Sequence, residues 1–178
     1  MGTNGQPIDR ASVHHELERV RADLHHLLGE ASSADLRRRT AGTRWTNQQL
    51  LWHMVFGFLI VRRLLPLVRF LARLPDPVSR VFASGLNAAT RPFHVVNYLG
   101  GVGGALVFHG PRLTWLTDRT LDELHRRLDA ESEATLHRAM HFPVDWDPFF
   151  QDSMSLEQVY RYGAQHYFFH REQLTLGR

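Results

Sequence analysis

The sequence predicts an all-α fold: a four-helix bundle with an irregular or helical insertion between its second and third helices. Two observations support this fold class. Long segments carry apolar residues at helical spacing, and three serine or threonine residues are each followed three positions later by glutamate or glutamine, as at helix N-termini. No two segments show the alternating apolar and polar residues that are typical of paired strands. The 178 residues therefore fit a single domain spanning residues 1–178.

The first helix is expected to run from Asp9 to Leu28. Its apolar residues recur every three or four positions, so they define one buried face: Val13, Leu17, Val20, Leu24 and Leu27. Gly29 supplies the stop signal. A polar connector, residues 31–44, leads to the second helix.

The second helix is expected to begin near Asn47, where Thr46 and Gln49 form a capping box. Leu50–Val61 is apolar on nearly every side, which is typical of a helix that is buried or that contacts lipid. This apolar run is too short to span a bilayer. Pro66 should kink the helix, and two later prolines should end it.

The insertion covers about Pro75 to Pro111. Pro92 and the glycine cluster Gly100–Gly104 interrupt it, so we expect irregular structure with one short helix before Thr90. The glycine cluster lacks the preceding strand of a dinucleotide-binding loop, so it does not indicate a phosphate site.

The third helix is expected to start at a second capping box, Thr120 with Glu123, and to run to about Met140, before Pro143. A third box, formed by Ser155 and its partner three residues later, opens the final helix, which should extend through about position 174.

The final helix carries His166 and His170, which lie one turn apart on one face and can therefore chelate one ion. Both fall on the apolar stripe of their helix, formed by Leu156, Val159 and Gly163. An unsatisfied buried polar group costs roughly 1–3 kcal/mol. A metal ion would give both imidazoles a partner at once.

A rival pair with the same spacing, His137 and His141, has the wrong phase. These histidines lie opposite the apolar face of the predicted third helix, formed by Leu121, Leu124 and Leu128, so they should meet solvent. His53 on the second helix is a candidate third ligand. Because this helix is apolar on all sides, its pattern does not show whether His53 lies on a buried face. Glycines beside these histidines, Gly57 and Gly163, suit either room for substrate or close helix packing.

Composition narrows the chemistry further. The chain has no cysteine, so disulfides, thiolate metal sites and a cysteine nucleophile are excluded, and metal ligands must come from His, Asp or Glu. All 21 cationic side chains are arginines, a bias typical of a GC-rich bacterial genome, and no nucleic-acid partner is expected. The segment Met1–Asp9 carries no apolar stretch, so no signal peptide is expected and the predicted location is cytoplasmic.

Arginines at steps of seven and four share one face of the second helix: Arg62, Arg69 and Arg73. Such a stripe is most often solvated, but it could also attract an anionic cofactor or a membrane surface.

Several motifs occur in an order found in one bacterial family. They are Leu36–Arg39, the Trp-Thr entry within Gly42–Thr46, the segment Leu50–His53, and a closing helix with Tyr160–Tyr162 and His166–Leu174. Together these motifs resemble the DinB/YfiT-like superfamily of four-helix bundles with a three-histidine metal site. The resemblance implies a metal site formed by a histidine triad, His53, His166 and His170.

The resemblance also suggests an activity. Members with known activity are thiol transferases or isomerases that use mycothiol, bacillithiol or glutathione. We therefore expect a metal-dependent enzyme, a low-molecular-weight-thiol S-transferase, whose partners are a thiol and a small-molecule electrophile. The three imidazoles suit zinc, nickel, iron or copper, with zinc or nickel expected first. An arginine of the stripe could hold the anionic thiol.

Two other functions stay open. A metal-dependent hydrolase would use metal-bound water, but no Asp or Glu stands beside the histidines in the sequence as a general base. A non-enzymatic protein that binds a ligand or a membrane surface is the third interpretation, suggested by the apolar second helix and the arginine stripe. A homodimer is compatible with each.

Overall fold

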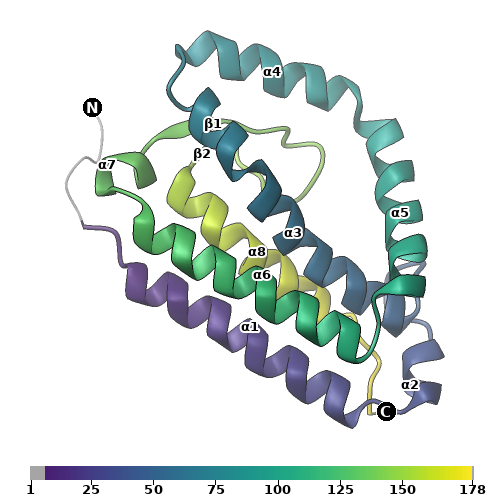
Figure 1. Cartoon of the computed structure of the whole chain (residues 1–178). Coiled ribbons are helices and arrows are strands. Elements are labelled where there is room, and N and C mark those ends of the chain that lie inside the picture. The colour runs from purple at the N-terminus through teal and green to yellow at the C-terminus, as the bar shows by residue number, and fades with distance from the viewer. Residues whose placement is uncertain (1–6, 178) are drawn as a thin grey trace.

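Four long helices pack side by side as a bundle in the computed structural model, which describes residues 7–177 (Figure 1). Their bounds are α1 (Arg10–Glu30), α3 (Asn47–Leu71), α6 (Pro111–Ala130) and α8 (Leu156–Arg171). Helices α1 and α3 do not neighbour each other closely, and each packs against both α6 and α8. The predicted four-helix bundle is therefore confirmed. Most of Met1–Asp9, the segment assessed for a signal peptide, lies outside the described residues.

The predicted apolar face of the first helix forms one wall of the core. Asp9 caps α1 by accepting the backbone N–H of Ser12, and the five apolar residues of the stripe are all buried. Each fully buried aliphatic side chain contributes about 1.5–3 kcal/mol relative to its exposed state. After α1, a short helix α2 (Ser33–Arg37) occupies part of the predicted polar connector.

Helix α3 is the central element, because α5, α6 and α8 all pack against it. It begins as predicted: the hydroxyl of Thr46 accepts the N–H of Gln49, and the Gln49 side chain accepts the N–H of Thr46. Pro66 lies inside the helix on its exposed side and does not end it. Among the described residues, no helix combines the length and the apolar character needed to cross a bilayer.

The insertion is more regular than predicted. It forms two helices, α4 (Asp76–Ala88) and α5 (Thr90–Val107), which together with α3 outline three sides of a triangle in Figure 1. The glycine cluster, expected to break the chain, lies inside α5. A Cβ atom added at Gly104 would lie 2.1 Å from Nε1 of Trp52, and one added at Gly101 would lie 2.9 Å from Nε1 of Trp45. These glycines therefore bring α5 close to the indole rings.

The predicted start of the third helix was wrong. Helix α6 begins at Pro111, after Gly110 adopts a positive φ of 51°, and not at Thr120. Thr120 lies within the helix, where its hydroxyl donates to the carbonyl of Leu116 one turn back. Threonine can satisfy its hydroxyl in this way inside a helix, so the capping pattern did not mark a helix start here.

The predicted end of the third helix, and the prediction that no strands pair, were also wrong. Helix α6 stops at Ala130, a single turn α7 (Glu133–Leu136) follows, and strand β1 (Ala139–His141) pairs antiparallel with β2 (Ser153–Ser155). Strand β2 leads directly into α8. The capping box at Ser155 is confirmed, and α8 ends at Arg171 rather than near position 174.

Two neighbouring glycines of α5 give a matched test of this packing. Gly104→Ala should lower the free energy of unfolding by about 1–3 kcal/mol, because its methyl group overlaps the Trp52 ring. Gly103→Ala has nothing within 4 Å of the added Cβ atom, so it should raise stability by about 0.5–1 kcal/mol. Urea denaturation of both variants measures the difference. Equal effects would show that α5 does not pack closely on α3.

Candidate metal centre

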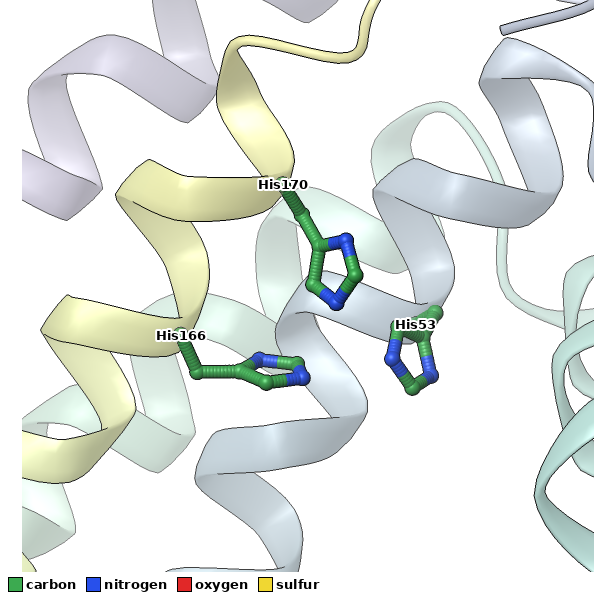
Figure 2. Close-up of side chains that lie close together, drawn as sticks. All are labelled: His53, His166 and His170. Carbon is green, nitrogen blue, oxygen red and sulfur yellow. The ribbon is translucent and has the colours of Figure 1, made fainter. Parts of the chain in front are cut away.

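Three histidines from two helices meet in the bundle. His53 extends from α3 toward His166 and His170 of α8 (Figure 2). One ring nitrogen from each residue lies within 4.8 Å of those of the other two. The ring centroids of His166 and His170 are 4.6 Å apart, and each lies 4.9 Å from that of His53. The structure thus brings together all three residues that were predicted as ligands.

Two glycines allow α3 and α8 to approach at this point. A Cβ atom added at Gly57 would lie 3.0 Å from Nδ1 of His166, and one added at Gly163 would lie 2.5 Å from Cε1 of Phe58. Both glycines therefore serve close packing, and Gly57 also lines a cavity beside the histidines. Any larger side chain at Gly57 would displace the His166 ring.

Burial keeps the three imidazoles neutral. Desolvation is the largest cause of a lowered pKa at each histidine, and it brings the pKa of His53 to about 3. The pKa of His166 also falls well below its usual value, and repulsion among the rings adds to desolvation at His53 and His166. Neutral imidazole is the form that binds a metal ion, so the ring lone pairs are available at neutral pH.

The hydrogen bonds of the three rings fit a metal ion. The Nδ1 atoms of His53 and His166 are buried and lack a hydrogen-bond partner among the described residues. Nδ1 of His170 donates to Oε1 of Gln173 at 2.7 Å, which leaves its Nε2 lone pair unused. Metal-binding histidines commonly use such a donor bond to fix the ring. The three histidines could therefore hold a divalent ion.

A carboxylate beside the histidines was missed in the sequence. Oδ2 of Asp147 lies 3.8 Å from Nε2 of His166 and accepts a hydrogen bond from the Tyr162 hydroxyl at 2.9 Å. Its other oxygen accepts the backbone N–H of Phe149. Burial raises the pKa of Asp147, although these hydrogen bonds oppose the shift. Asp147 lies in the β1–β2 loop, where no periodicity operates, and the only local signal was the turn-forming Asp-Pro pair.

The rival histidine pair is divided between two environments. His137 is partly exposed, 3.6 Å from Glu133, as expected of a solvated residue. The prediction that His141 meets solvent was wrong, because the chain has left the helix and His141 lies buried on β1. Its Nε2 is 2.9 Å from Asp76 and its Nδ1 is 3.1 Å from Asp152.

The arginine stripe is not at the histidine cluster. Arg69 forms an ion pair with the buried Glu131, which also accepts the Tyr160 hydroxyl at 3.3 Å. Arg62 borders a separate surface depression, and Arg73 is exposed. The structure therefore brings none of these three arginines to the predicted ligands.

The histidine cluster opens into a cavity of about 480 Å³. Besides the three histidines and Asp147, its wall is mostly apolar and contains many aromatic rings, including Phe56, Phe82, Phe93, Trp146, Phe150 and Phe169. Helices α3, α4, α5 and α8 and the β1–β2 loop all contribute to this wall. The insertion therefore forms one side of the site.

A four-helix bundle with three histidines converging from α3 and α8 defines a class of helical proteins with a candidate metal centre. A family model of the DinB superfamily matches residues 16–174, so the chain belongs to the DinB superfamily. No curated protein and no solved structure matches the chain significantly.

The metal content of histidine variants tests the centre. The purified protein should carry about one divalent ion per chain, and His166→Ala should lose most of it because one of three ligands is gone. His137→Ala should keep the full content, since His137 lies outside the cluster. Elemental analysis measures both, and circular dichroism checks that each variant is folded. Equal metal in wild type and His166→Ala would contradict the site.

The metal-free protein should lose stability in mild acid. The folded-state pKa of His53 is about 3 against 6.5 for the ordinary side chain, so only the unfolded chain takes up this proton between these values. The stability linked to neutral His53 is complete above pH 6.5 and is lost as pH falls, by about 1.4 kcal/mol per pH unit. His53→Gln should show a shallower slope in urea denaturation with chelator present. Parallel slopes would contradict the assignment.

Proposed function

We propose that the protein is a metal-dependent enzyme that transfers a low-molecular-weight thiol to an electrophilic substrate. The observation that carries the proposal is three neutral imidazoles, two buried and one half-buried, that meet at one cavity. A site with three protein nitrogens beside a cavity leaves room for exogenous ligands, as catalytic metal sites do. A structural site, by contrast, is usually closed by four protein ligands.

The nucleophile has to come from outside the chain, because the protein contains no cysteine. A divalent ion held by His53, His166 and His170 would supply Lewis acidity that lowers the pKa of a thiol. We propose zinc or nickel as this ion and mycothiol, bacillithiol or glutathione as the thiol. The family's known activities, as expected from the resemblance, support this choice.

The chain's own residues hold the reacting groups in place. Gln173 fixes the His170 ring through Nδ1, and the glycines of α3 and α8 set the spacing of the other two rings. Asp147, held by Tyr162 and the Phe149 N–H, presents an acceptor next to His166. The apolar wall excludes water from the electrophile, which strengthens each polar interaction at the histidine end.

Hydrolysis is the second candidate, and Asp147 is the observation that favours it. The sequence offered no carboxylate beside the histidines, but the structure places Asp147 Oδ2 3.8 Å from Nε2 of His166. A carboxylate there could orient a water molecule for attack on an ester or amide. Thiol transfer needs no such carboxylate. Replacing Asp147 should therefore impair hydrolysis but not thiol transfer.

Conjugation of a thiol to monobromobimane tests the leading proposal. Protein loaded with zinc or nickel should accelerate conjugation of at least one of the three thiols, and His170→Gln should reduce this rate more than tenfold because a ligand is lost. His137→Ala should retain the rate. A lack of acceleration with all three thiols would contradict thiol transfer.

A panel of esters and amides, assayed without thiol, tests the alternative on the same samples. Hydrolysis that falls at least tenfold in Asp147→Asn, together with no thiol conjugation, would establish the second candidate instead. Comparable metal content in Asp147→Asn and wild type would show that the loss comes from the carboxylate and not from the ion.

A further inference from the structure

The polar groups of the cavity are concentrated at one end. Asp147 and the three histidines form that end, and Tyr162 joins them through its hydrogen bond to Asp147. Away from this cluster, the polar side chains of the wall are few, and His94 and Asn97 of α5 are the main ones. A ligand would therefore meet hydrogen-bonding groups mainly at the metal centre.

The rest of the wall is aliphatic and aromatic. Helix α3 contributes Ile60 and Leu64, which are 39% and 44% exposed, and α4 contributes Phe82 and Leu86. Exposed aliphatic side chains in a hollow lose contact with water when an apolar ligand binds, and this is a favourable contribution to affinity.

The far wall is fixed by contacts between the insertion and the β1–β2 loop. The rings of Phe93 and Trp146 stack with centroids 4.0 Å apart and planes inclined by 9°. Nε1 of Trp146 donates to the carbonyl of Leu86, and His141 pairs with Asp76 at the start of α4. These contacts fix α4, α5 and the β1–β2 loop against one another on this side of the cavity.

The charge of the wall also restricts the ligand. Among the described residues that line the cavity there is no arginine, and the chain contains no lysine. Asp147 is the one carboxylate in this lining, and it lies at the histidine end. A carboxylate or sulfonate on the body of a ligand would find no counter-charge along the apolar wall, and its burial there would be costly.

We propose that the substrate held in this cavity is a lipophilic small molecule, with an uncharged alkyl or aryl body along the apolar wall and a single reactive polar group at the histidine end. The cavity volume of about 480 Å³ lies within the usual range for small-molecule sites. That this ligand is a substrate rests on the proposed function. The charged portions of a thiol such as glutathione then stay outside the apolar part of the cavity.

Binding of the uncharged fluorophore N-phenyl-1-naphthylamine to metal-free protein tests the assignment without any catalytic step. Wild type should bind it saturably. Ile60→Glu and Leu64→Glu place a charge on the wall at partly exposed positions that tolerate it, and they should weaken binding at least tenfold. The matched control is Leu106→Glu on α5, which is 74% exposed and outside the cavity lining, and it should bind as wild type does.

Competition with straight-chain alcohols identifies the kind of occupant. Each added CH₂ should improve displacement of the fluorophore about fourfold until the chain fills the cavity, after which potency levels off. Glutathione should not displace it. Improvement with no levelling, or equal weakening in Leu106→Glu, would indicate an open apolar surface such as one that meets a bilayer, and would overturn the proposal.

The outcomes separate this inference from the proposed function. Wild type that fails to bind the fluorophore, or binding unaffected by Ile60→Glu and Leu64→Glu, overturns the lipophilic ligand even if metal-loaded protein conjugates thiols. Fluorophore binding that Ile60→Glu and Leu64→Glu weaken, in a protein that neither holds a metal ion nor conjugates thiols, supports a lipophilic ligand in the cavity and overturns the enzymatic proposal.

Discussion

The close approach of α3 and α8 is the constraint on which the site depends. It buries the imidazoles of His53 and His166 away from water, with His170 half-buried beside them, and it depends on Gly57 and Gly163, which carry no side chain at the contact. Burial of polar rings costs stability, and the unpartnered Nδ1 atoms of His53 and His166 show that hydrogen bonds within the protein do not offset this cost at those two rings. Sites that carry such a cost are commonly functional.

The insertion adds an apolar wall beside the histidine cluster, so the histidines lie at one end of a cavity. Helices α4 and α5 leave the end of α3 and return to its beginning, where Gly101 and Gly104 pack against two indole rings. The same Trp45 ring lies 4.4 Å from the His53 ring, centroid to centroid. The packing of the insertion and the position of the first histidine are therefore linked through one side chain.

Sequence patterns correctly predicted the features that depend on residues three or four positions apart. The boxes at Thr46 and Ser155 were confirmed, because each involves a side chain and a backbone only three residues away, and the phase of His166 and His170 follows from helix geometry alone. The box at Thr120 failed because an intrahelical bond gave its hydroxyl another partner. The helical state of α5 and the role of Asp147 depend on contacts between distant segments, which no local pattern records.

The ligands come from opposite parts of the chain, with His53 on the second long helix and the other two on the last. During synthesis, a ribosome-bound chain that has released α3 but not α8 presents only one of the three imidazoles of the cluster. The candidate metal centre is complete only after α8 has been made and has docked against α3. A truncated product that lacks α8 would therefore lack two of the three histidines that could hold an ion.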